Sequence, residues 1–262
     1  MSIRLKILRK EFLIALFCLI SLISARTSKA QDYIKTSKDF FTAVRNKNTD
    51  ASKFAEQLAS ASQEKLKTQL NTEDKAKAFW INIYNTYVQN ALVKNPKLFE
   101  DRSKFFKTEG IKIAGKMLSP DDIEHGIIRH SKNKLSMGYV GKVSVSDFEE
   151  KFRLEKVDYR VHFALNCGAK SCPPVALYQA EKLQAQMDKS TVLYLKKFAT
   201  YDAKTNIAMA PVLCSWFKAD FGGEDGTLDI LIKNKIVPAG KKANVKYLDY
   251  DWTLSLGNYI DL

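Results

Sequence analysis

The chain has 262 residues, of which 45% are hydrophobic and 27% are charged. This balance is typical of a folded globular protein, and it excludes a disordered chain, a collagen-like repeat and a membrane protein with many spans. The formal net charge of +13 points at first to a nucleic-acid partner, so its distribution along the chain has to be considered.

Residues 1–30 have the features of an export signal. Basic residues at positions 4–10 precede an apolar run at positions 12–23 that is too short to span a bilayer. Ser28 and Ala30 place small side chains at the two positions that signal peptidase reads, which predicts cleavage after Ala30. We therefore expect an exported protein, periplasmic or secreted. A retained membrane anchor is the alternative interpretation.

Cleavage would change both the charge and the cysteine count. Residues 1–30 contain six basic residues and one acidic residue, so 36 basic and 28 acidic residues remain and the net charge falls to +8. The remaining charges are mixed in sign, so we expect no nucleic-acid partner, and no other segment has the apolar length of a membrane span. Of the three remaining cysteines, Cys167, Cys172 and Cys214, two can pair in an oxidising compartment and one is left over.

Helical signals dominate the first third of the mature chain. Ser37 and Thr49 are placed to cap two short amphipathic helices. Thr72, followed by two acidic residues, predicts the start of a long helix that ends near Lys94, just before an Asn-Pro pair.

This long helix has no charged residue between positions 77 and 94, and its apolar residues cover a wide face at helical spacing. We therefore expect it to be largely buried. Asn82 and Asn85 interrupt the apolar residues, and buried amides need internal partners. They either link parts of the core or face a binding site. Trp80 and Tyr84 likewise either belong to the core or line a ligand groove.

Ser119-Pro120, followed by two aspartates, predicts the start of another helix, with a capping serine and a proline at the first helical position. Three isoleucines mark its buried face, and Glu124 lies between them. His125 and Arg129 are four residues apart and share another face of this helix.

The rest of the chain mixes strands with short helices. Strands are predicted at residues 105–106, 111–113, 161–167 and 245–252, and a hairpin around residues 205–206. Pro173 predicts a further helix start, with Cys172 at its N-cap. Helices followed by mixed elements indicate an α+β fold, in which N-terminal helices pack on a small mixed or antiparallel sheet within a single domain of residues 31–262.

Five segments of the chain together resemble the bacterial and plant family known as domain of unknown function 547. In chain order they are residues 78–85, 118–129, 160–174, 216–222 and 250–252. The run Cys-Gly-Ala-x-Ser-Cys-Pro-Pro, which begins at Cys167, is the most specific of these motifs. The resemblance implies a single α+β domain and no assigned activity. Tyr159 departs from the Asp-Pro-Arg that the family often has here, and Cys214 is peculiar to this chain.

Cys167 and Cys172 are the candidates for nucleophilic chemistry. The positive end of a helix would favour the Cys172 thiolate, and Cys167, at the end of a strand and beside a glycine, would open onto a cleft. Either placement suits a thiol-dependent hydrolase or acyltransferase of the papain or transglutaminase kind. Its substrate would be a peptide or another amide-containing molecule of the cell envelope. His125 would be the general base, and Glu124 is a candidate to orient a histidine.

The same residues leave other interpretations open. Cys167 and Cys172 can instead form a disulfide across a tight loop or remain inert buried thiols. A zinc site is the weakest alternative, because no pair of residues has zinc-ligand spacing, and we expect neither a metal nor a cofactor. On an extended strand His162 would lie about 17 Å from Cys167, on the opposite face. In that position His162 is either a core histidine or, together with Arg129, a binding residue. With structural cysteines the chain would be a non-catalytic envelope domain that binds a ligand or partner.

Overall fold

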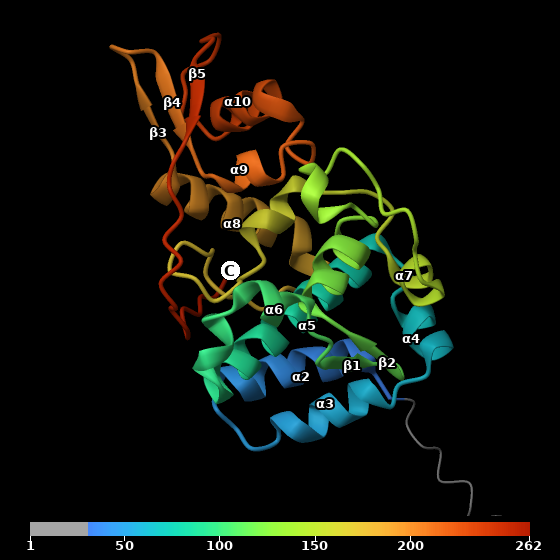
Figure 1. Ribbon diagram of the computed structural model, residues 1–262. Helices are drawn as coiled ribbons and strands as arrows, with labels where there is room; N and C mark the ends of the chain where they lie inside the picture. Colours follow the sequence, from blue (N-terminus) through green and yellow to red (C-terminus); the bar gives the residue numbers. More distant parts are fainter. Residues whose placement is uncertain (1–30) are drawn as a thin grey trace, which may run out of the picture. The chain divides into compact units, whose positions relative to one another are not determined.

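The computed structural model describes residues 31–262 (Figure 1). The predicted export signal lies outside these residues. Residues 33–262 form one compact unit in which helices predominate and the strands form two small sheets, so the α+β class is confirmed. No helix within residues 31–262 is long and apolar enough to cross a membrane.

The N-terminal part of the unit consists of helices α2 (Tyr33–Arg45), α3 (Ala51–Ala59), α4 (Gln63–Gln69) and α5 (Glu73–Lys94). Thr72 caps α5 as predicted, because its hydroxyl accepts a hydrogen bond of 3.3 Å from the amide three residues later. The two earlier caps are wrong. Ser37 lies inside α2, where its hydroxyl donates to a backbone carbonyl, and α3 begins after Asp50 instead of Thr49.

Helix α5 is the centre of the larger hydrophobic core, and it is buried on nearly every side. Trp80 is fully buried, and its indole meets the rings of Phe79, Phe148 and Phe152 edge to face. Such aromatic contacts stabilise a core beyond the area they bury. Trp80 is therefore a core residue and does not line a groove.

Two buried asparagines of α5 hold the loop that crosses it. Asn82 donates to the carbonyl of Tyr178 at 2.8 Å and accepts from its amide at 2.9 Å. Asn85 donates to the carbonyl of Ala164 at 2.9 Å and accepts from the amide of Asn166 at 2.8 Å. These bonds satisfy backbone groups that no neighbouring strand pairs. Both amides are thus polar links within the core.

The segment after α5 contains η1 (Pro96–Phe99), α6 (Arg102–Lys107), the antiparallel hairpin β1 (Ile111–Ile113) and β2 (Lys116–Leu118), the π-helix η2 (Asp122–Ile128) and η3 (Lys134–Ser136). The predicted strand at residues 105–106 is wrong, because Asp101 caps a helix there. Two consecutive apolar residues are too few to distinguish the two-residue repeat of a strand from the 3.6-residue repeat of a helix. The helix start at Ser119 is confirmed. Ser119 and Asp122 exchange hydrogen bonds of 2.9 and 3.1 Å.

The C-terminal half contains α7 (Asp147–Phe152), η4 (Tyr159–Phe163), η5 (Ala180–Lys182), α8 (Leu183–Phe198), α9 (Leu213–Trp216) and α10 (Gly223–Lys233). The predicted strand at residues 161–167 is wrong. Its first part is the 3₁₀-helix η4 and the rest is an irregular loop. No helix starts at Pro173 either. A short apolar run that is buried on all sides shows no alternation of apolar and polar residues. Its sequence is therefore equally compatible with a strand and with a buried turn.

A second sheet and a second core lie at the other end of the unit from α2 and α3 (Figure 1). Its strands are β3 (Thr200–Asp202), β4 (Ile207–Ala210) and β5 (Asn244–Tyr247), with β3 antiparallel and β5 parallel to β4. The predicted hairpin is confirmed, and the closing strand is shorter than predicted. The chain then returns beside the cysteine loop, where Ser171 and Asp251 exchange hydrogen bonds of 3.2 and 2.9 Å.

Candidate functional site

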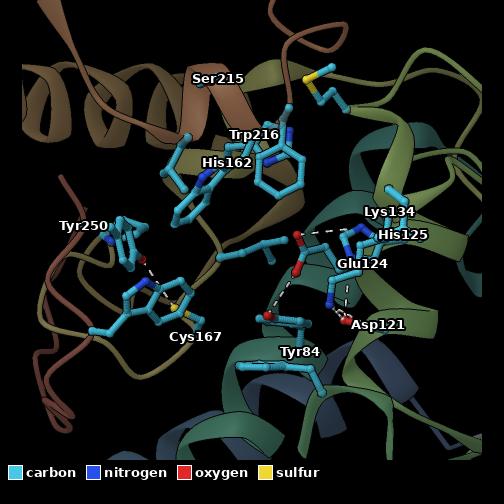
Figure 2. A pocket seen from close by; sticks show the side chains of 18 residues that line it. Tyr84, Asp121, Glu124, His125, Lys134, His162, Cys167, Ser215, Trp216 and Tyr250 are labelled. Carbon is cyan, nitrogen blue, oxygen red and sulfur yellow. Dashed lines mark hydrogen bonds and ion pairs between the residues drawn. The ribbon is translucent and has the colours of Figure 1, made fainter. Parts of the chain in front are cut away.

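A cavity of about 520 Å³ opens where several segments of the fold meet (Figure 2). The segments include α5, η2, the loop after η4, α9 and the returning C-terminal segment. Residues that line it include Tyr84, Glu124, His125, His162, Cys167, Trp216, Tyr250 and Trp252. Its size is within the usual range for small-molecule sites, and it brings together five of the residues singled out in the sequence.

One wall of the cavity is aromatic. The ring centroid of Tyr250 lies 5.0 Å from that of Trp216 and 4.6 Å from that of Trp252, and the two indoles stack 5.6 Å apart. Trp216 and Trp252 are 36% and 37% exposed. Sequence reasoning did not select these three residues as site residues, although they belong to two of the family-like motifs. Trp216 is 34 residues before Tyr250 in the chain, so the sequence does not show that these rings form one wall.

Glu124 is one of two acidic residues in the cavity lining, and Asp121 is the other. The Glu124 carboxylate accepts a hydrogen bond of 3.1 Å from the hydroxyl of Tyr84. Burial raises the pKa of Glu124, and neighbouring Asp121 raises it further, while Arg129 acts in the opposite direction. Burial also raises the pKa of Tyr84 well above its ordinary value, so its hydroxyl keeps its proton and donates. Asp121 is paired with Lys134 at 2.8 Å.

His125 is held as a neutral imidazole. Its Nδ1 accepts a hydrogen bond of 2.8 Å from Arg129, and because an arginine only donates, the ring proton is on Nε2, 3.6 Å from Asp121. Burial, followed by the charge of Arg129, lowers the pKa of His125 well below its ordinary value. In this arrangement His125 has no free lone pair with which to act as the predicted general base.

Behind His125, Arg129 and His162 both bond to Asp220, a residue that sequence reasoning missed. Arg129 is fully buried, and its Nε lies 2.5 Å from the Asp220 carboxylate, while Nε2 of His162 lies 2.9 Å from the same oxygen. The ring of His162 stacks on Phe217 with centroids 3.9 Å apart. Although burial opposes it, hydrogen bonds from His162 and Arg129 lower the pKa of Asp220 to about 2. Arg129 is a positioning residue and lies outside the cavity wall.

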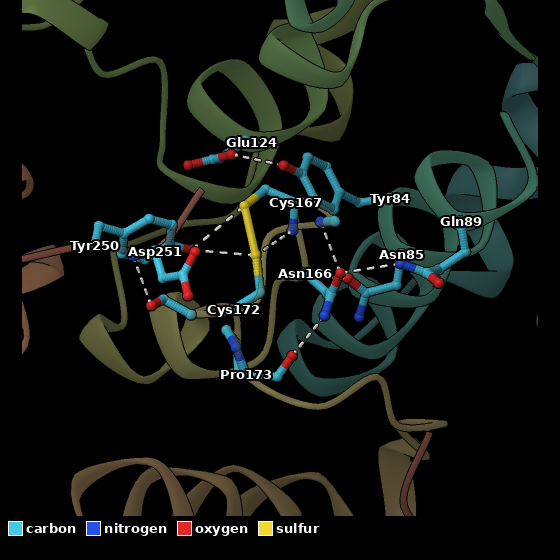
Figure 3. The surroundings of a disulfide bond; sticks show 12 residues. Tyr84, Asn85, Gln89, Glu124, Asn166, Cys167, Cys172, Pro173, Tyr250 and Asp251 are labelled. Carbon is cyan, nitrogen blue, oxygen red and sulfur yellow. Dashed lines mark hydrogen bonds between the residues drawn. A yellow bond between two sulfur atoms is a disulfide. The ribbon is translucent and has the colours of Figure 1, made fainter. Parts of the chain in front are cut away.

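Cys167 and Cys172 form a disulfide, with Cα atoms 6.3 Å apart (Figure 3). A thiol nucleophile at either position is therefore ruled out in this form of the protein, because a disulfide carries no thiolate. The helix end expected at Cys172 is also absent. The leftover Cys214 is buried, and burial raises the pKa of its thiol to about 12. Within residues 31–262, no three His, Cys, Asp or Glu side chains are grouped to hold a metal ion.

The hydroxyl of Tyr250 contacts both sulfur atoms, at 3.1 Å from Sγ of Cys172 and 3.4 Å from Sγ of Cys167. The amide of Cys167 also donates to Sγ of Cys172 at 3.0 Å. Cys172 is only 2% exposed, whereas Cys167 is partly exposed and lines the cavity. The two halves of the disulfide thus have different environments.

Residues 67–195 match the family described as "Protein of unknown function, DUF547". The match includes α5, η2 and the disulfide loop, and it ends before Trp216 and Tyr250. No curated protein and no solved structure is significantly similar to the chain. The chain is therefore a DUF547 domain-containing protein.

Proposed function

We propose that this protein is an exported envelope domain that binds a small, largely apolar ligand in the cavity, with its paired cysteines as part of the wall. The cavity itself carries this proposal. Its aromatic wall lies across from a few polar groups, among them the Glu124 carboxyl, and a mostly apolar concavity with few polar groups is typical of ligand sites. Export rests on the sequence of residues 1–30, and a disulfide is compatible with an oxidising compartment.

The exposed indoles support a ligand in contact with the aromatic wall. Trp216 and Trp252 present large apolar rings to solvent beside a concavity, and a ligand that covers them would gain roughly 25 cal/mol for each Å² of apolar surface removed from water. Glu124 would orient that ligand through a hydrogen bond, and burial, which raises the pKa of Glu124, favours the protonated form that donates one.

Binding can be tested with the neutral apolar fluorophore N-phenyl-1-naphthylamine. We expect its fluorescence to rise and saturate with the purified protein, and Trp216→Ala to weaken its binding at least fivefold by removing part of the wall. Leu193→Ala, which shortens an exposed side chain on α8 outside the cavity, is the matched control and should bind as the wild type does. Binding that does not saturate, or is equal in both variants, would contradict the proposal.

A second candidate is the thiol-dependent hydrolase or acyltransferase, which would require reduction of the disulfide. It is favoured by one observation, that Cys167 and Glu124 line the same cavity. Because His125 is engaged by Arg129, Glu124 would be the base.

After reduction, this candidate predicts that iodoacetamide modifies Cys167 near neutral pH faster than it modifies free cysteine. Glu124→Gln should slow that reaction about tenfold, while His125→Gln should have a smaller effect. Modification no faster than that of free cysteine would exclude this candidate.

A further inference from the structure

We propose that the Cys167–Cys172 disulfide is a site of thiol–disulfide exchange, at which a thiolate that enters the cavity attacks Sγ of Cys167 and displaces Cys172. The substrate class is a molecule that carries a thiol. This activity goes beyond ligand binding and does not depend on it.

The two sulfur atoms differ in access. Cys172 is 2% exposed, whereas Cys167 is partly exposed and lines the cavity. Figure 3 shows the disulfide with its Cys167 end toward Glu124 and Tyr84, two other residues of the cavity wall. Exchange requires the incoming thiolate to reach one of the two sulfurs. The cavity therefore selects Cys167 as the attacked atom.

Sγ of Cys172, the buried sulfur, is the better leaving group. The amide of Cys167 and the hydroxyl of Tyr250 both point to Sγ of Cys172, at 3.0 and 3.1 Å. Hydrogen bonds donated to a thiolate stabilise the charged form, and a more stable thiolate leaves faster. Burial raises the pKa of Tyr250 well above its ordinary value, so its hydroxyl is a donor at neutral pH.

The loop does not depend on the disulfide for its shape. The side-chain amide of Asn166 donates to the carbonyl of Pro173 at 2.7 Å, and the amide of Cys172 donates to the carbonyl of Ala169 at 3.0 Å. Ser171 is bonded to the C-terminal segment. A disulfide that closes so short a loop also removes less chain entropy than one that closes a long loop. The sulfurs can therefore separate while their surroundings remain in place.

The exchange proceeds in two steps. An incoming thiolate forms a bond to Sγ of Cys167, and the electron pair of the broken bond goes to Sγ of Cys172, which becomes a thiolate. A second thiolate then attacks the incoming sulfur and releases Cys167 as a thiolate. In total two thiols are oxidised to one disulfide, and the protein disulfide gains two electrons and the two protons.

The first test compares single-cysteine variants exposed to oxidised glutathione. Cys172→Ser leaves Cys167 on the cavity wall, and we expect it to form a mixed disulfide at least tenfold faster than Cys167→Ser, in which the remaining thiol is buried. Mass spectrometry of the folded protein measures both rates, and Cys214 is the internal control for an inaccessible thiol. Equal rates would overturn the proposal.

The second test compares the wild-type protein with Tyr250→Phe and leaves both cysteines in place. In buffers of reduced and oxidised glutathione we expect the disulfide to open faster than the protein unfolds globally. Tyr250→Phe keeps the ring and should favour the disulfide about tenfold, because one hydrogen bond to the thiolate is lost. Reduction only at the rate of global unfolding, or an unchanged equilibrium in Tyr250→Phe, would overturn the proposal. Loss of naphthylamine binding alone would instead count against the ligand site.

Discussion

Replacing Asp220 with alanine is expected to lower the free energy of unfolding by about 3–5 kcal/mol, the effect of leaving a buried charge without its partner. Arg129 is fully buried, and its Nε lies 2.5 Å from Asp220. His162 would lose the same partner. Urea denaturation followed by circular dichroism measures the change.

The matched control for this prediction is Asp261→Ala. Asp261 also pairs with an arginine, Arg45, at 2.6 Å, but its side chain is 83% exposed. Exposed pairs contribute about 0–1 kcal/mol, because water and salt screen them. If the two substitutions destabilised the protein equally, the buried network would not hold the fold around the cavity as we infer.

The second large effect is a loss of stability when the pH falls from about 6.5 to about 4. Burial, opposed by the hydrogen bond that His162 donates to Asp220, lowers the pKa of His162 from 6.5 to about 4. Between pH 4 and pH 6.5 the unfolded chain binds a proton at His162 that the folded protein does not bind. The contribution of His162 to the free energy of unfolding is therefore fully present above pH 6.5 and decreases as the pH falls. A shift of this size corresponds to about 3 kcal/mol, and His125, whose pKa is also lowered, acts in the same direction.

Unfolding curves measured from pH 7 to pH 4 would test this expectation. His162→Gln should flatten the pH dependence of the unfolding free energy, because glutamine does not titrate. His130→Gln is the control, since His130 contacts the carbonyl of Leu154 and lies outside the Asp220 network. A wild-type slope in His162→Gln would show that another group is responsible. Below pH 4, protonation of Asp220, whose pKa is lowered to about 2, should remove further stability.

Both predictions concern one network that joins distant parts of the chain. Arg129 follows η2, whose isoleucines belong to the larger core, whereas Asp220 lies between α9 and α10, next to Phe221 of the smaller core. The guanidinium of Arg129 also lies 4.5 Å from the ring centroid of Phe217, on which His162 stacks. This network thus holds His125 and His162 at the cavity, and its bond from Arg129 takes up Nδ1 of His125, the nitrogen through which that ring would act as a base.

Local signals in the sequence were sufficient for part of the fold. Helix α5 begins after Thr72 and ends at Lys94 as predicted, because a capping hydroxyl and a long uncharged stretch are both local features. The hairpin of β3 and β4 follows from its turn residues in the same way. The segment at residues 161–167 could not be predicted, because backbone groups of Ala164 and Asn166 are bonded to the side chain of Asn85, about 80 residues away on α5.

The sequence alone determined the α+β class, the central helix, the family and the pair of cysteines on which the chemistry depends. Only the tertiary structure decided that these cysteines are paired, that Arg129 engages His125, and that Tyr250 and Asp220 complete the surroundings of the cavity. Caps, turns and periodicity act over a few residues and can be read from the chain. A disulfide, a buried ion pair or a cavity wall depends on distances between residues that only packing brings together.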